Sequence, residues 1–202
     1  MKLSLGDNVR FLNEPMDGIV SAIIDDKTVG VTVNNDFEIP VPMNQVVKIS
    51  HNDFFARLEQ KQAAEPKQAE KGLDEYIYLA FVHADEKNMD VFLVNHTQEL
   101  IAVNYFTVQG KEAGNKNLCL IDAFQTARMQ TLPVSTFSEW PVFYIQILKQ
   151  PQHSIPPPLQ WNMKMQANKF FKQLRAVPLL KKQGYIFTLD NTLSTEDIKA
   201  LE

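Results

Sequence analysis

Cysteine and glycine are scarce in this sequence, and long hydrophobic runs are absent. Cys119 is the only cysteine, so an internal disulfide is excluded, which favours a reducing compartment. Seven glycines leave no glycine-rich loop of the kind that binds a nucleotide phosphate or a dinucleotide. No apolar run approaches the roughly 20 residues that span a bilayer, and the first residues lack the apolar segment of a secretory signal. These absences predict a cytoplasmic chain without a membrane partner.

Patterns for catalysis and metal binding are also missing. The histidines, His51, His83, His96 and His153, have no cysteine or second histidine at metal-ligand spacing. Cys119 lies in an apolar strand pattern, where a buried and unreactive thiol is expected. The paired acids fall at expected turns or strand starts, where solvation accounts for them: Asp25-Asp26, Asp74-Glu75 and Asp85-Glu86. We therefore expect no catalytic residue, no metal site and no cofactor, and we predict that this chain is not an enzyme.

The stretch from Gly6 to Ile49 has the pattern of a small β domain. Its β-branched and aromatic residues occur in short runs, many at alternating positions. Turn residues separate these runs, as at Pro15-Met16-Asp17-Gly18. This pattern predicts a small, strongly bent barrel of about five strands.

Four short motifs give this stretch a family resemblance. They are an opening Gly6-Asp7-Asn8-Val9, a Gly18-Ile19-Val20 after a turn, an acidic hairpin at Asp25-Asp26, and a closing segment from Val41-Pro42 to Val46-Val47. The stretch resembles the SH3-like (KOW/Tudor-like) barrel of MutS-related proteins. The whole chain is similar to the N-terminal region of the Smr-domain (small MutS-related) proteins of Bacteroidetes-type bacteria, which are related to the second bacterial MutS family. In those proteins a barrel and a β-sandwich precede a C-terminal Smr domain.

The resemblance implies a link to DNA repair or recombination, but it places nuclease activity outside this chain. The Smr domain has an early Asp-Leu-His motif and a later His-Gly-x-Gly-x-Gly motif, and neither occurs here. The resemblance therefore implies that the Smr domain is absent from this chain. It also implies that the domains present are accessory, and position a partner or a nucleic acid for the Smr domain.

The rest of the sequence predicts a linker and a second β domain. Residues 1–58 are expected to form the barrel, 59–72 a polar linker, 73–190 an antiparallel β-sandwich, and 191–202 the start of a linker or helix to a missing domain. The predicted fold class is therefore all-β. The expected sandwich strands are 76–82, 89–95, 99–108, 118–124, 141–148, 159–164 and 184–189, the first three as a meander. Residues 142–148 are apolar at both alternating sets of positions, which predicts burial between layers or at a partner.

Positive charge is concentrated toward the end of the chain. The net charge is −4, yet residues 140–189 contain no acid. The basic residues there interleave with Phe170 and Phe171, an arrangement that can hold phosphates and stack bases. The favoured alternative is a short amphipathic helix that packs Phe170, Phe171 and Leu174 against the sandwich and leaves the lysines solvated. The nucleic-acid-binding candidates are Lys164, Lys169, Lys172, Arg175, Lys181 and Lys182.

Three hypotheses for function follow from the sequence. The first is a pair of non-catalytic accessory domains that bind a partner or nucleic acid, as the resemblance implies. The second is a structural or oligomerisation scaffold that binds only protein, with an exposed sheet edge as one candidate site. The third is an unrecognised small-molecule-binding sandwich, which requires a deep pocket with convergent polar groups. A protein partner or self-association is expected, and nucleic acid stays an open alternative.

Overall fold

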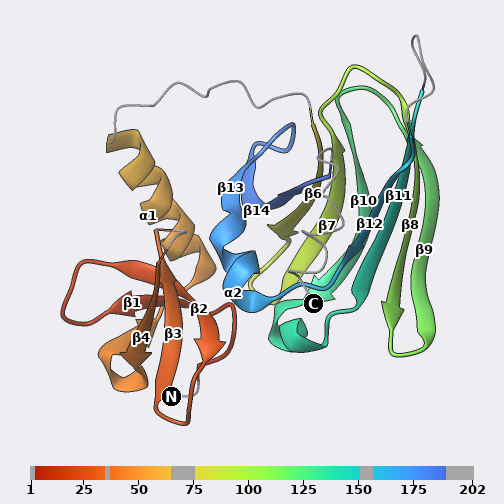
Figure 1. Ribbon diagram of the computed structural model, residues 1–202. Coiled ribbons are helices and arrows are strands. Elements are labelled where there is room, and N and C mark those ends of the chain that lie inside the picture. The colour runs from red at the N-terminus through yellow and green to blue at the C-terminus, as the bar shows by residue number, and fades with distance from the viewer. Residues whose placement is uncertain (1–2, 35–36, 65–75, 151–156, 190–202) are drawn as a thin grey trace.

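The structure is a computed structural model that describes residues 3–34, 37–64, 76–150 and 157–189 (Figure 1). The predicted segment 191–202, most of the predicted linker and the pair Asp74-Glu75 lie outside these ranges. No helix in the described part of the chain has the length and apolar character needed to cross a membrane. In chain order, the elements are β1 (Asn8–Phe11), β2 (Asp17–Ile23), β3 (Thr28–Val33), β4 (Phe37–Pro42), η1 (Met43–Gln45), β5 (Val46–Lys48), α1 (His51–Ala64), β6 (Ile77–His83), β7 (Asn88–Asn95), β8 (Ile101–Gln109), β9 (Glu112–Ile121), β10 (Gln125–Pro133), η2 (Val134–Glu139), β11 (Val142–Lys149), β12 (Leu159–Met163), α2 (Ala167–Phe170), η3 (Phe171–Gln173), β13 (Leu174–Val177) and β14 (Lys182–Thr188).

Strands β1 to β5 form one antiparallel sheet, here called the N-terminal sheet, in the order β4-β3-β2-β1-β5. Alternate residues of these strands, such as Val9, Val29 and Val31, point to one side and form a small core. The predicted five strands are confirmed. Among the described residues β4 and β5 do not pair with each other, so the sheet is bent and open rather than a closed barrel.

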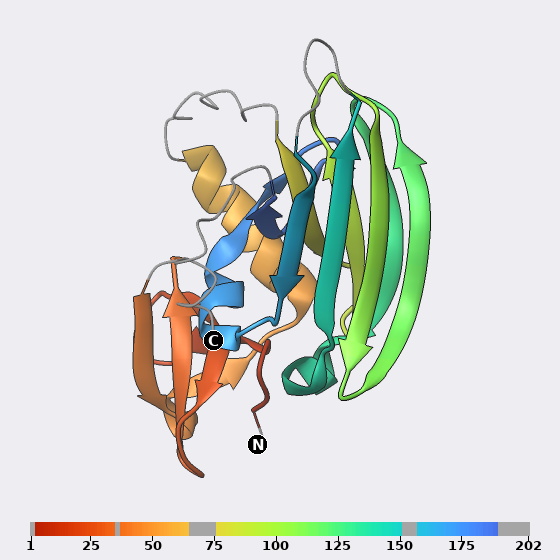
Figure 2. The same cartoon turned by 45° about the vertical axis from the view of Figure 1, so that its right-hand side comes forward.

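Strands β6 to β14 form a sandwich of two antiparallel sheets, which confirms the all-β prediction. The inner sheet has the order β10-β7-β6-β14-β13 and lies nearer the N-terminal sheet, and the outer sheet has the order β12-β11-β8-β9 (Figures 1 and 2). Aromatic rings fill the space between the two sheets. Phe81 on β6 lies with its ring centroid 5.6 Å from Trp140, 5.5 Å from Phe143 and 5.1 Å from Phe170. The main hydrophobic core is therefore inside the sandwich.

The topology of the sandwich departs from the predicted meander. Strands β6 and β7 pair as expected, but β8 crosses to the outer sheet and pairs with β9 and β11. Strands β10 and β13 were not predicted, because β10 is rich in polar residues and β13 has only four residues. Gly114 and Asn115 lie within β9, at a register shift in the ladder with β8.

The N-terminal sheet packs directly against the sandwich. Ile19 on β2 and Phe54 on α1 are buried in the main core together with sandwich residues. Gly6, in the opening motif, has a φ of 82°, and a Cβ there would lie 2.8 Å from Val134 Cγ1 and 3.2 Å from the Phe171 ring. Only glycine allows both this backbone conformation and this close approach. Helix α1 also extends beyond the predicted barrel boundary at residue 58, so the predicted linker begins as helix.

Candidate functional site

The six basic candidates are distributed over the segment from the end of β12 to the start of β14. Lys164 Nζ donates a hydrogen bond to the carbonyl oxygen of Trp140, so this lysine holds the segment against the sandwich. Arg175 and Lys182 lie on one face of the β13–β14 ladder, because Arg175 pairs with Gly184 and Lys182 with Val177. Lys169 lies on α2 and Lys172 on η3. Lys181 lies in the β13–β14 turn, directly before Lys182 at the start of β14.

The aromatic residues of this segment belong to the core. Phe170 and Phe171 are fully buried and Leu174 is buried, although α2 has only four residues. The ring centroid of Phe170 lies 4.5 Å from that of Tyr185 and 4.9 Å from that of Phe137. Neither phenylalanine is available to stack on a base. The packing predicted for the amphipathic alternative is therefore confirmed, but on a single helical turn followed by a strand.

A cavity of about 460 Å³ lies where α1, the β6–β7 turn and the β13–β14 turn meet. His51 and His83 both line it, and their rings contact each other with centroids 3.9 Å apart and planes tilted by 40°. Burial, reinforced by the neighbouring His51, lowers the pKa of His83 to about 4, and burial also lowers the pKa of His51. Both rings are therefore neutral near pH 7, and they act as aromatic packing between α1 and the inner sheet.

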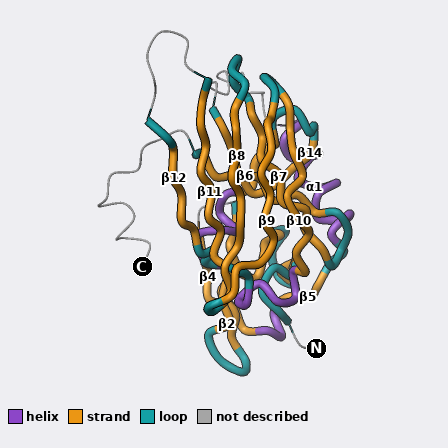
Figure 3. The backbone as a smooth tube through the Cα atoms, turned by 90° about the vertical axis from the view of Figure 1, so that its right-hand side faces the viewer, coloured by secondary structure: helices purple, strands orange, loops and turns teal. Residues whose placement is uncertain are grey.

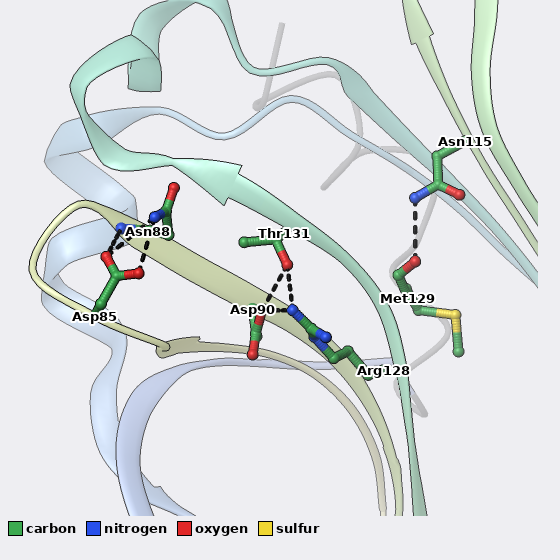
Figure 4. A network of polar contacts seen from close by, with 7 residues as sticks. All are labelled: Asp85, Asn88, Asp90, Asn115, Arg128, Met129 and Thr131. Carbon is green, nitrogen blue, oxygen red and sulfur yellow. Dashed lines mark hydrogen bonds and ion pairs between the residues drawn. The ribbon is translucent and has the colours of Figure 1, made fainter.

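The cavity carries charges of both signs. Lys181 and Lys182 line one part of it, and Asp85 and Glu86 line another. Asp85 Oδ1 accepts hydrogen bonds from the backbone N–H groups of Lys87 and Asn88 at 2.7 and 2.9 Å. The hydrogen bond from the Asn88 side chain, together with these backbone bonds, lowers the pKa of the Asp85 carboxyl. Asp85 thus shapes the turn (Figure 4), and the two acids offset the charge of the lysines, which makes the cavity a poor anion site.

Metal-ligating residues do not converge in the part of the chain that the structure describes. No group of three or more His, Cys, Asp or Glu side chains there is placed to hold a metal ion. Cys119 lies on β9 with its side chain half-buried, and burial raises the pKa of its thiol. A raised thiol pKa disfavours the reactive thiolate.

The outer sheet has a side that no described element covers, here called the open face. In Figure 3 the sheet faces the viewer, with β12, β11, β8 and β9 side by side. Register places alternate residues of the four strands on this face. The residues between them point to the opposite side of the sheet, toward the core. Read across the strands, the open face consists of Leu120, Ala102 and Leu148; Leu118, Asn104, Gln146 and Gln160; Lys116, Phe106, Tyr144 and Asn162; and Ala113, Val108 and Val142.

Leucines of the open face are unusually exposed. The exposed fraction is 83% for Leu118, 68% for Leu120 and 56% for Leu148. Lys116 is the only charged residue of this face, although charged residues make up 22% of the chain. The solvated face of a sheet normally carries charged or polar side chains. Exposed leucines beside a central polar row, with a single charge on the whole face, are typical of an interaction site.

Side-chain contacts within the open face already order it. The rings of Phe106 and Tyr144 stack at 4.9 Å between centroids, with 3° between their planes. Asn104 Nδ2 donates a hydrogen bond to Gln146 Oε1 at 2.9 Å. The sequence signal for this surface was the apolar run 142–148. One set of its side chains fills the sandwich core, and the other set, with Tyr144 and Leu148, lies on the open face.

The edge strands β9, β10 and β4 are less suited to strand addition than the sequence suggests. Asn115 on β9 donates a hydrogen bond from its side chain to the carbonyl oxygen of Met129 (Figure 4), and Asn117 donates a second one to the same oxygen, each at 3.1 Å. Met129 lies at the register shift of β10, which frees its carbonyl for these bonds. On the N-terminal sheet, the edge strand β4 contains Pro40 and Pro42, which cannot donate backbone hydrogen bonds.

Comparison with known proteins gives one match. Residues 8–57 match the model of a domain of unknown function, DUF8465. The match covers the N-terminal sheet and the first half of α1, and it assigns no activity. No curated protein matches the chain.

Proposed function

We propose that this chain is a non-catalytic binding module that works through protein–protein contact on its open face. The observation that carries this proposal is the composition of that face. Three exposed leucines, two stacked aromatic rings and one lysine lie on a regular four-stranded sheet. Burying such a surface against a partner stabilises a complex by roughly 25 cal/mol for each Å² of apolar area removed from water.

The family resemblance gives this module a setting. If the chain precedes an Smr domain, the module positions a partner for that domain in a process linked to DNA repair or recombination. The support for this setting is the set of motifs between Gly6 and Val47. The rigid packing of Gly6 against Val134 and Phe171 fits a positioning role, because it fixes the N-terminal sheet relative to the open face.

Nucleic acid is the less favoured occupant. The open face has one cation, and phosphate binding depends on several. Arg175 and Lys182 form a small basic group elsewhere, but Phe170 and Phe171 are buried behind it. Titration of labelled single-stranded, duplex and branched DNA and of RNA against the chain tests this alternative. Salt-sensitive binding that Lys169→Glu, Lys172→Glu and Arg175→Glu abolish would replace protein contact as the primary function.

Site-specific photo-crosslinking tests the proposal directly. A photoreactive amino acid replaces Gln146 at the centre of the open face, and a matched control replaces Leu12, which is 60% exposed in the β1–β2 turn. We expect a protein crosslink from position 146, in cells that naturally express the chain, and none from position 12. Equal crosslinking at both positions, or a nucleic-acid product at position 146, contradicts the proposal.

A further inference from the structure

We infer that the occupant of the open face is a second copy of this chain, and that two copies pair outer sheet against outer sheet about a two-fold axis. The inference rests on the proposed function, because it names the partner of that same surface. Three properties of the open face favour a second copy over a different partner: its polar groups, its charge and its area.

The polar groups at the centre of the open face can form hydrogen bonds with the same groups of a second copy. Asn104, Gln146 and Gln160 lie in one row across three strands. Each side-chain amide both donates and accepts hydrogen bonds, so the row can pair with an identical row turned by 180°. Asn104 and Gln146 already bond each other, which lowers the cost of removing them from water. A partner surface of donors alone or acceptors alone would leave half of these groups unpaired.

Charge on the open face also favours a second copy. The face contains no acid, and Lys116 lies on the edge strand β9. In a two-fold pair this lysine stays at the rim, where water solvates it. Two copies therefore meet without like-charge repulsion at the centre. A strongly acidic or basic partner would find no opposite charges there, and electrostatic complementarity would contribute nothing.

The area of the open face suffices for a dimer. Its strands have five, eight, nine and ten residues. With strands about 4.8 Å apart and about 3.4 Å per residue, the sheet measures roughly 19 by 27 Å, or about 500 Å². Two copies bury about 1,000 Å², which reaches the lower limit for a specific interface. Interfaces of this size are typical of weak, transient complexes.

Sedimentation equilibrium tests the inference on the whole chain from about 1 to about 300 µM. We expect the mass to rise with concentration from that of one 23.1 kDa chain to twice that value. Leu118→Glu places two carboxylates in the interface and should raise the dissociation constant at least tenfold. Leu12→Glu, on an exposed leucine outside the open face, should leave the constant unchanged. Circular dichroism and the thermal midpoint at about 1 µM verify that both variants fold as the wild type does.

Failure of this inference is distinguishable from failure of the proposed function. A wild-type chain that stays monomeric up to 300 µM, or a dimer that both variants weaken equally, overturns the two-fold pair. The photo-crosslinker at position 146 then separates the two ideas. A product with a different protein retains the proposed function with another partner. A dimeric crosslinked product supports both, and no product at position 146 overturns both.

Discussion

The two outward sides of the sandwich differ in how far their apolar side chains are exposed to solvent. On the inner sheet, the side turned away from the core buries Tyr78, Val94 and Ile186 within the chain; we call it the covered face. Its exposed part, on β7 and β10, carries a charged network of Asp90, Arg128 and Thr131 (Figure 4). On the outer sheet, the open face leaves its leucines in water and carries one charge. The covered face therefore contributes to the folded core, and the open face is the surface for which we propose a partner.

An acidic residue introduced on each face should give the largest difference in unfolding free energy between the two faces. Val94→Asp on the covered face buries an unpaired carboxylate and should lower the free energy of unfolding by about 4 kcal/mol or more. Leu118→Asp on the open face should change it by less than about 0.5 kcal/mol in the monomer, because the side chain stays in water. Urea denaturation at sub-micromolar protein concentration measures both values. Equal costs would show that the open face is part of the folded core.

Asn95 links the two sheets of the sandwich by hydrogen bonds, and its substitution measures what this link contributes to stability. This buried residue at the end of β7 donates hydrogen bonds from its side chain to the carbonyl oxygens of Glu99, Ile121 and Asp122. It therefore links the inner sheet to the end of β9 in the outer sheet. Asn95→Ala removes the three hydrogen bonds to these carbonyls and the two that Asn95 Oδ1 accepts from Thr97, and it should cost about 3 kcal/mol of unfolding free energy. The exposed Asn162→Ala is the matched control and should cost less than about 0.5 kcal/mol; equal losses would refute the structural role of Asn95.

Acidification should weaken the contact between α1 and the inner sheet. The pKa of His83 is lowered to about 4 in the folded chain, mainly by burial, and is about 6.5 in the unfolded chain. The unfolded chain therefore binds more protons, and stability is full above about pH 6.5 and is lost as the pH falls toward 4. We expect a loss on the order of 2 kcal/mol between about pH 7.5 and about pH 5.

His83→Phe separates this histidine from the other titrating groups nearby. The variant keeps a ring against His51 and Tyr185 but cannot take up a proton. His51, Asp85 and Glu86 remain, so part of the pH dependence persists. Urea denaturation across the same pH range should show a flatter profile than the wild type. An unchanged profile would mean that His83 is not the group responsible.

The exposed ion pair on the covered face should contribute least. Arg128 lies 2.6 Å from Asp90, but its side chain is more than half exposed. Exposed pairs of this kind contribute about 0 to 1 kcal/mol, so Arg128→Ala should cost about 0.5 kcal/mol. Thermal unfolding at low and high salt measures this loss, and the difference from wild type should shrink in high salt. A larger, salt-independent loss would show that the network is structural.

The sequence predicted strand content well and connectivity poorly. Alternation and turn residues predicted β6, β7, β11 and β14, because each strand has a regular apolar pattern. The same patterns do not specify which sheet a strand joins, so the crossing of β8 was missed. Strand β10 escaped prediction because its residues are mostly polar and its bulge at Met129 disrupts alternation.

The open face was only partly predictable. The apolar run 142–148 indicated two buried faces or a partner, but Leu118 and Leu120 carry no local sign of exposure. Their position depends on the pairing of β9 with β8, which is a long-range property. In the basic segment, the sequence did not decide where the aromatic rings lie. The sequence allowed either base stacking or core packing for its phenylalanines and favoured core packing, and the contacts of Phe170 with Phe137 and Tyr185 show that it is a core residue.

Hydroxyl-radical footprinting at low and high protein concentration tests most directly whether the open face is a contact surface. The method reports the solvent accessibility of each side chain. The account predicts that Leu118, Leu120 and Leu148 become protected as the concentration rises, while Leu12 and Phe37 stay equally reactive. Unchanged reactivity of the three leucines across the whole concentration range would contradict the pairing of two open faces.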